Sequence, residues 1–206
     1  MTAISLGVSP YSPWDLEMAN MGYKVIQYDA SISKAPYNHP NIIFIKKFVG
    51  ARDSEDTISF LSVIKDNNLD ENLHNILQCD IEDCEWEMLE NIDLDLVSKF
   101  FSQIIFEFHN CDIDNESFTQ RRLKVLEKLN SKYTPIHAHF NNNGKIIYCD
   151  GLLFSTLIEV SYIRNDLVPR NAKYKQGSGY LAELDAPNLA NFPDVPIFFD
   201  KSFKEI

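Results

Sequence analysis

The chain of 206 residues carries 30 acidic and 19 basic side chains, a formal net charge of −11, and 45% hydrophobic residues. This composition is typical of a globular chain, and its length suits one domain with a substantial core. The acidic balance argues against nucleic acid or an anionic membrane as the main partner, because both require clustered Lys and Arg. No apolar run is long enough to span a bilayer, so we expect no membrane insertion. The four cysteines lack CxxC spacing and are predicted to be reduced, as in a cytoplasmic protein.

Seven apolar runs are predicted to be β-strands, and most of them alternate with helical segments. The strands are expected at 2–8, 23–29, 41–45, 74–79, 103–109, 133–140 and 156–163. Helices are expected at 13–22, 56–66, 83–89, 94–101 and 117–130, the fourth as a continuation or replacement of the third. The last two strands are joined only by a polar loop with a short apolar insert, without a helix.

This alternation predicts an α/β protein with βαβ units and a mostly parallel, Rossmann-like sheet. Since no helix separates the last two strands, the last strand is free to run antiparallel, and the simplest arrangement places it at the edge of the sheet. We expect residues 1–164 to form the domain. Residues 165–206 are rich in Pro, Asn and Gly and are expected to form a C-terminal extension that packs on or near the site.

The ends of the first two strands carry the first candidate ligand-binding residues, because an open parallel sheet binds ligands at the carboxyl ends of its strands. The first strand ends in Gly7, Val8 and Ser9, and a glycine there lets a ligand approach the backbone. The second ends in Asp29, whose carboxylate can accept hydrogen bonds from both hydroxyls of a ribose. A capping or turn aspartate is the alternative. Gly7 and Asp29 together favour nucleoside binding.

Acidic and histidine side chains mark the later strands at the same edge. They are Asp80, Glu82, Glu107, His109, His137, His139 and Glu159. A buried glutamate such as Glu107 is costly unless it is paired or bound to a metal. This convergence can activate a hydroxyl, with His109 or His139 as the base, or it can hold a divalent cation on Asp80, Glu107 and His109. For each histidine, a hydrogen-bonded core position is the alternative.

The residues around these candidates are given structural roles. Asp83 is expected to cap the helix that follows it, and Glu85 and Glu87 are expected to form its solvated face. Trp86 is predicted to pack in the core, and the basic face at 121–128 to be surface.

Two blocks of the sequence resemble the FkbM-like branch of S-adenosylmethionine-dependent methyltransferases: LQCDIEDCEWEML at 77–89 and QIIFEFHN at 103–110. In that branch one strand ends in Asp-Ile-Glu-Gly and the next in an acidic Glu-x-His segment. IHAHFNNN and TLIEVSYIRNDLV also resemble its closing strands, and ELDAPNLANFPDVPIFF resembles the tail of some members. The resemblance implies a class I methyltransferase fold, with a seven-stranded sheet and an antiparallel last strand beside the fifth.

The resemblance also implies an activity: O-methyl transfer from S-adenosylmethionine to a hydroxyl of a sugar, a saccharide precursor or a related small molecule. Gly7 and Ser9 would flank the methionine part of the cofactor, Asp29 would bind the ribose, and Asp80 and Glu82 would lie beside the sulfonium or the acceptor. The predicted catalytic residues are His109, His139, Glu107 and Glu82, and the need for a divalent cation stays open.

The sequence departs from the family pattern at three points. The first motif reads Leu-Gly-Val-Ser with a single glycine, and Asp83 replaces the glycine of Asp-Ile-Glu-Gly. The chain also begins directly at the first strand, which leaves two alternatives: an open acceptor pocket, or one completed by a second subunit in a homodimer. Two other functions are alternatives. A nucleotide-dependent oxidoreductase is disfavoured by the absence of GxGxxG and Tyr-x-x-x-Lys, and a non-catalytic partner of the same fold is suggested by the single glycine.

Overall fold

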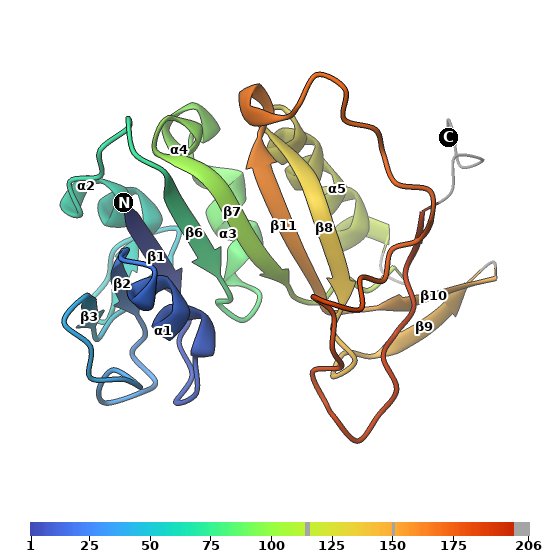
Figure 1. Ribbon diagram of the computed structural model, residues 1–206, viewed down its shortest axis with the longest axis horizontal. Helices are drawn as coiled ribbons and strands as arrows, with labels where there is room; N and C mark the ends of the chain where they lie inside the picture. Colours follow the sequence, from blue (N-terminus) through green and yellow to red (C-terminus); the bar gives the residue numbers. More distant parts are fainter. Residues whose placement is uncertain (114–115, 150, 200–206) are drawn as a thin grey trace.

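Figure 1 shows the computed structural model, which describes residues 1–113, 116–149 and 151–199. All seven predicted strands lie in one central sheet. They are β1 (Thr2–Leu6), β2 (Lys24–Tyr28), β3 (Ile42–Ile45), β6 (Asn75–Cys79), β7 (Phe101–Phe108), β8 (Tyr133–Phe140) and β11 (Ile158–Arg164). The prediction of an α/β fold around a seven-stranded, mostly parallel sheet is therefore confirmed, and the fold is compatible with a Rossmann-like class.

The strand order of the sheet is β3-β2-β1-β6-β7-β11-β8. Neighbouring strands from β3 to β7 are parallel, and β11 is antiparallel to both β7 and β8. The expected edge position of the last strand is therefore wrong, because β11 lies between two strands and β8 forms the edge. Pro135 in β8 explains this exchange, since proline donates no backbone hydrogen bond and is tolerated mainly on edge strands. Val160 and Tyr162 of β11 are instead buried in the core.

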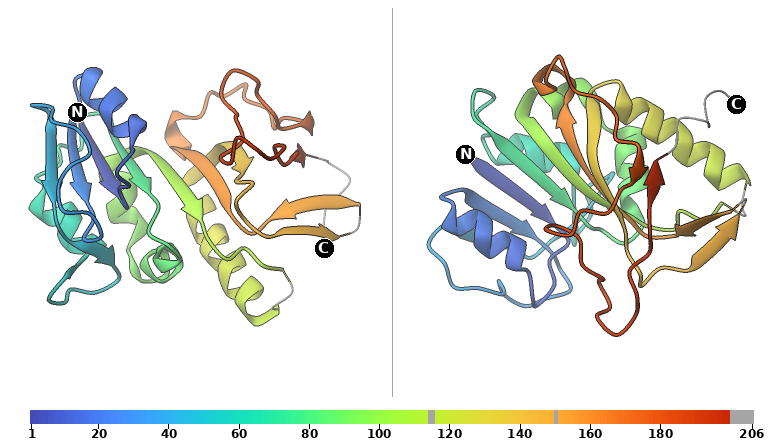
Figure 2. Two further views of the ribbon diagram at one scale, coloured as in Figure 1. Left: turned by 90° about the horizontal axis from the view of Figure 1, so that it is seen from below. Right: turned by 45° about the vertical axis from the view of Figure 1, so that its right-hand side comes forward.

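Helices cover both faces of the sheet, as the two views of Figure 2 show. They are α1 (Pro13–Asn20), α2 (Phe60–Asp66), α3 (Cys84–Asn91), α4 (Leu94–Phe100), α5 (Glu116–Asn130) and the short 3₁₀ helix η1 (Asn165–Leu167). Helix α1 lies on one face, and α3 and α5 lie on the other. The larger hydrophobic core fills the second face, where Leu77 and Phe106 pack among the same buried residues as Trp86 and Leu129. The prediction that Trp86 packs in the core is confirmed.

Two of the predicted helical segments differ in the structure. The segment expected at 56–66 begins with strand β5 (Thr57–Ser59), which pairs with β4 (Phe48–Gly50), and only Phe60 starts the helix. Ser59 ends the strand and caps α2 by accepting a hydrogen bond from the backbone N–H of Ser62. Farther along, α3 and α4 are separate helices, because Ile92 adopts an extended conformation and Asp93 caps α4 through the backbone N–H of Asp95.

The polar loop before β11 contains a β-hairpin that was not predicted. Strands β9 (Ile146–Cys149) and β10 (Leu152–Ser155) pair with each other and project beyond the central sheet (Figure 1). Farther on, the short strands β12 (Gly177–Ser178) and β13 (Phe198–Phe199) pair within the C-terminal extension.

The structure also gives the state of the cysteines and the character of the helices. All four cysteines are free thiols, with Cys79 buried and Cys84 exposed. None of the described helices combines the length and the apolar character that crossing a membrane requires.

Candidate functional site

The carboxyl ends of β1 and β6 are in direct contact through Gly7. This residue has φ +78, and a Cβ atom added to it would lie 1.6 Å from the carbonyl oxygen of Asp80. The backbone N–H of Asp80 donates to the carbonyl of Leu6 at 2.9 Å. Only glycine fits this left-handed position against the neighbouring backbone. The backbone at this position therefore requires a glycine, whether or not a ligand binds there.

Asp29 lies at the end of β2, as predicted, and it fastens the turn that follows β1. Its carboxylate accepts hydrogen bonds from the backbone N–H of Val8 at 2.8 Å and from the N–H and hydroxyl of Ser31 at 2.6 and 2.5 Å. Ser9, on the same turn, is exposed and bonds with the backbone of Tyr11. A ribose that binds Asp29 must therefore share or replace the bonds to Ser31.

The end of β7 places His109 among three carboxylates. The backbone N–H of His109 donates to Glu85 Oε1 at 2.6 Å, and its Nδ1 lies 3.2 Å from the same oxygen. Its Nε2 lies 3.3 Å from Glu82 Oε2 and 3.6 Å from Asp80 Oδ1. We call His109, Asp80, Glu82 and Glu85 the His109 cluster. The predicted meeting of Asp80, Glu82 and His109 is thus found in the structure.

The prediction for Glu85, a member of the His109 cluster, is wrong. Glu85 was expected on a solvated helix face, whereas its side chain is 0% exposed. Since β7 ends at Phe108, the backbone N–H of His109 has no partner in the sheet and needs an acceptor. Glu85 supplies this acceptor from α3. Glu87, two residues farther along the same helix, is exposed as predicted.

The turn between β6 and α3 aims Glu82 at His109 by an unusual backbone conformation. Glu82 has φ +53 and Asp83 has φ +78, both in the left-handed region that non-glycine residues rarely adopt. Asp83 occupies the N-cap position of α3, but its side chain makes no capping hydrogen bond. It lies 3.6 Å from Arg122 Nη2 instead. The prediction that Asp83 caps the helix is therefore right in position and wrong in mechanism.

Burial and neighbouring charges shift the pKa values of the His109 cluster. Burial, helped by the charges of Glu82 and Glu85, raises the pKa of Asp80 to about 6. Burial lowers the pKa of His109, but its hydrogen bond to Glu85 and the charges of Glu85 and Asp80 prevail and raise that pKa to about 9. At neutral pH, in the absence of another cation, His109 is therefore protonated and paired with the acids around it.

A second group of polar side chains lies beside the His109 cluster on β7, β8 and β11. His139 Nδ1 lies 3.4 Å from Glu159 and its Nε2 lies 3.0 Å from Asp194, while Asn141 donates to Glu107 at 2.8 Å. The pKa of His139 is raised to about 9, first by Glu159 and also by Asp194. Burial, with the charges of Asp80 and Glu159, raises the pKa of Glu107 to about 7. We call these five residues the His139 cluster.

The C-terminal extension contributes to the His139 cluster and lies over the ends of β8 and β11 (Figure 2). Besides Asp194, its Asp185 lies 2.7 Å from His137 Nε2, and its Asn188 donates to Glu159 at 2.7 Å. Asn142 accepts a hydrogen bond from the backbone N–H of Leu189 at 2.8 Å. The described part of the extension therefore forms one wall of the candidate site.

One group of side chains in the described part of the chain has the spacing of metal ligands. Asp80, Glu82 and His109 each offer one ligand atom, and these atoms lie within 4.8 Å of one another. The predicted third ligand, Glu107, is not a member of this group, and its carboxylate bonds to Asn141 instead. Of the three predicted ligands, Asp80 and His109 therefore lie together, and the third side chain of this group is Glu82 rather than Glu107.

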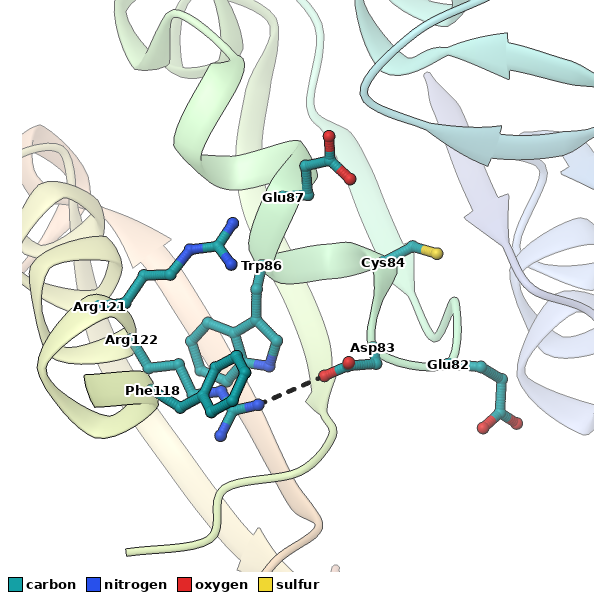
Figure 3. A pocket seen from close by; sticks show the side chains of 8 residues that line it. All are labelled: Glu82, Asp83, Cys84, Trp86, Glu87, Phe118, Arg121 and Arg122. Atoms are coloured by element: carbon teal, nitrogen blue, oxygen red, sulfur yellow. Dashed lines mark ion pairs between the residues drawn. The ribbon is translucent and has the colours of Figure 1, made fainter. Parts of the chain in front are cut away.

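A pocket with a volume of about 260 Å³ opens between α3 and α5, next to the His109 cluster (Figure 3). Its lining residues are Glu82, Asp83, Cys84, Trp86, Glu87, Phe118, Arg121 and Arg122. Trp86 Nε1 donates to the carbonyl of His109 at 2.8 Å, and the Arg122 guanidinium lies 5.4 Å from the centre of the Trp86 ring. Lys128 donates to the carbonyls of Leu89, Glu90 and Ile92 at the end of α3. The prediction that 121–128 is plain surface is therefore wrong for Arg122 and Lys128.

The sheet edge as a whole combines carboxylates, imidazoles and amides on converging strands. Such a site attracts a cationic ligand and can orient or deprotonate a hydroxyl. The chain matches no protein-family model and no curated protein. The roles assigned to individual residues below therefore rest on this geometry and on the sequence resemblance.

Proposed function

We propose that the protein is an S-adenosylmethionine-dependent O-methyltransferase that acts on a hydroxyl of a sugar, a saccharide precursor or a related small molecule. The observation that carries the proposal is the strand order β3-β2-β1-β6-β7-β11-β8 with its reversed β11 next to β7. This is the arrangement that the resemblance to FkbM-like methyltransferases implies. The Asp-Ile-Glu block of that resemblance directly follows β6 and supplies Asp80 and Glu82 of the His109 cluster.

The cofactor is assigned to the ends of β1, β2 and β6. Gly7 leaves the backbone turn open to a ligand, and Asp29 offers carboxylate oxygens to the ribose hydroxyls. S-adenosylmethionine carries a sulfonium and an ammonium group, and the carboxylates of Asp80 and Glu82 complement these positive charges. Charge complementarity thus supports a cationic cofactor at this edge.

Glu107 is assigned as the base that accepts the proton of the acceptor hydroxyl. In methyl transfer the C–S bond of the sulfonium breaks as the new C–O bond forms, and the hydroxyl proton passes to a base. A base works best when its pKa is near the working pH. Glu107, with a pKa of about 7, fits this requirement better than His109 and His139, whose pKa values of about 9 keep them protonated. The histidines then serve to position the carboxylates and the acceptor.

Calorimetric titration with S-adenosylhomocysteine tests the proposal. We expect micromolar binding by the wild type and a loss of at least tenfold in affinity for Asp29→Ala. Asp70→Ala is the matched control, because Asp70 also accepts hydrogen bonds from the second residue after it, Asn72, but lies at the opposite end of β6. The proposal fails if the wild type does not bind, or if both variants bind as the wild type does. Binding of a nicotinamide dinucleotide instead would favour an oxidoreductase, and binding of neither ligand a non-catalytic partner.

A further inference from the structure

We infer that Asp80, Glu82 and His109 form a binding site for a divalent transition-metal ion, with Glu85 as the residue that positions His109. The inference concerns the same site as the proposed function, but its argument and its test use the cofactor-free protein, in which no cofactor charge complements Asp80 and Glu82. One imidazole and two carboxylates supply the donor atoms, and these atoms already lie within 4.8 Å of one another. Bringing such atoms a little closer around an ion needs only side-chain rotation, because the Glu82 side chain is 85% exposed.

The buried Glu85 gives His109 the orientation of a metal ligand. Histidines that bind metals usually donate the proton of the other ring nitrogen to a carboxylate or carbonyl, which fixes the tautomer. Nδ1 of His109 lies 3.2 Å from Glu85 Oε1, so a neutral ring keeps its proton there and turns the lone pair of Nε2 toward Asp80 and Glu82. Glu85 is completely buried and also holds the backbone of His109. The ring is therefore fixed before a metal arrives.

Two buried carboxylate oxygens of the cluster have no hydrogen-bond donor among the described residues, although the His109 ring lies beside both side chains. Asp80 Oδ1 is shielded from solvent and accepts no hydrogen bond from the residues that the structure describes, and the same holds for Glu85 Oε2. Glu85 is fully buried and contacts the ring that would bind the ion. A buried oxygen without a partner is unfavourable, and an adjoining cation relieves this cost. Of the two, Asp80 Oδ1 faces Nε2 of His109 at 3.6 Å, on the side where the ion would bind, and it points to a ligand independently of the spacing of the cluster.

The donor set selects the class of ion. An imidazole with two carboxylates suits Mn²⁺, Fe²⁺, Co²⁺ or Zn²⁺, whereas Mg²⁺ and Ca²⁺ prefer oxygen ligands alone. Cys84 is exposed close to the cluster and could bind a soft ion. Mn²⁺ is the better probe, because it favours oxygen and nitrogen over thiolate ligands.

Titration of the cofactor-free protein with Mn²⁺, followed by electron paramagnetic resonance, tests the inference. We expect one ion per chain with micromolar affinity. Glu82→Gln should weaken binding at least tenfold without changing the melting temperature, because its side chain is exposed. Glu85→Gln keeps an acceptor for the backbone of His109 and should weaken binding about tenfold, as loss of such an outer partner does. His74→Gln, which changes an exposed histidine at the other end of β6, should bind as the wild type does.

The inference is overturned if the wild type binds no Mn²⁺ at millimolar concentration. It is also overturned if Glu82→Gln and Glu85→Gln bind as tightly as the wild type. Failure of S-adenosylhomocysteine binding with intact Mn²⁺ binding would contradict only the proposed function, and the reverse result would contradict only the metal site.

Discussion

Glu85 and His109 are 24 residues apart in the sequence and are joined by a buried carboxylate that accepts the backbone N–H of His109 at 2.6 Å. The contact connects the first turn of α3 to the end of β7. It fixes the ring of His109 opposite Asp80 and Glu82. It also satisfies the backbone N–H of His109, which has no partner strand beyond the end of β7. The candidate site and the packing of α3 on the sheet thus depend on the same side chain.

Replacing Glu85 tests this double role. Glu85→Ala removes the acceptor of a buried N–H, and we expect it to lower the free energy of unfolding by about 2 to 3 kcal/mol. Glu87→Ala, on the exposed face of the same helix, should change it by less than about 0.5 kcal/mol. Urea denaturation of the two variants measures the difference. Equal stabilities would mean that the buried carboxylate does not support the end of β7.

Gly7 should tolerate no side chain. Gly7→Ala meets the carbonyl of Asp80 at 1.6 Å, so we expect a loss of about 4 kcal/mol or more, or failure to fold. Gly22→Ala is the control, since Gly22 also has a positive φ, +90, but nothing lies within 4 Å of its added Cβ. This control should lose only about 1 to 2 kcal/mol. Thermal melts of both variants separate the steric clash from backbone strain.

The shifted pKa values predict that stability declines from mildly acidic to alkaline pH. The pKa of His109 is raised to about 9, so its favourable pairing is complete below pH 6.5 and is lost as the pH rises through 9. Asp80 and Glu107, with pKa values raised to about 6 and 7, bind protons more tightly when folded, so their ionisation also disfavours the fold. His139, whose pKa is also raised to about 9, contributes in the same way as His109. All four groups therefore act in the same direction.

We expect the free energy of unfolding to fall by about 3 kcal/mol or more between pH 6 and pH 9. Urea denaturation at several pH values measures this slope. His109→Gln removes one of the two histidine contributions and should make the decline above pH 7 shallower, while His139 keeps its own contribution. A stability that rises over this range in the wild type would contradict the electrostatic description of the site.

Asn142 should hold the C-terminal extension on the sheet. Its side chain bonds to the backbone N–H of Leu189 and to the carbonyls of Leu189 and Phe192. We therefore expect Asn142→Ala to speed limited proteolysis within 180–199 several-fold. The matched control is Asn143→Ala, because the adjoining Asn143 is exposed and bonds to Asn141 through its backbone. Equal cleavage rates would show that the extension is held by other contacts.

The strands of the sheet could be predicted from the sequence because each is an apolar run, and all of them except β3 contain buried residues. The strand alternation alone placed β11 at the edge, since strand order depends on which strand tolerates an edge. The resemblance instead implied an antiparallel last strand beside the fifth, and β11 does lie next to β7. The hairpin β9–β10 was missed because its apolar residues face solvent, with Tyr148 73% exposed, so it has no burial pattern to detect. Strands β4 and β5 are three residues long and too short to give a periodicity.

The residues of the candidate site also fall into those that the sequence could predict and those that it could not. Asp80, Glu107, His109 and His139 were found because they interrupt apolar strands at positions where sheets bind ligands. Glu85 was missed because an acid in an acidic helical segment looks like a solvated side chain, and only the distant end of β7 makes its burial favourable. Asp194 and Asn188 were missed because nothing in an irregular segment shows which strand it will contact.

Hydrogen exchange measured with and without S-adenosylhomocysteine tests the proposed methyltransferase site, because it shows which parts of the chain the ligand covers. If the ligand binds where β1, β2 and β6 end, peptides covering 7–12, 29–33 and 80–84 should exchange more slowly in its presence. The hairpin β9–β10 should exchange as before. Protection confined to other parts of the chain, or no protection at a saturating concentration, would contradict the assignment of a methyltransferase site to this edge of the sheet.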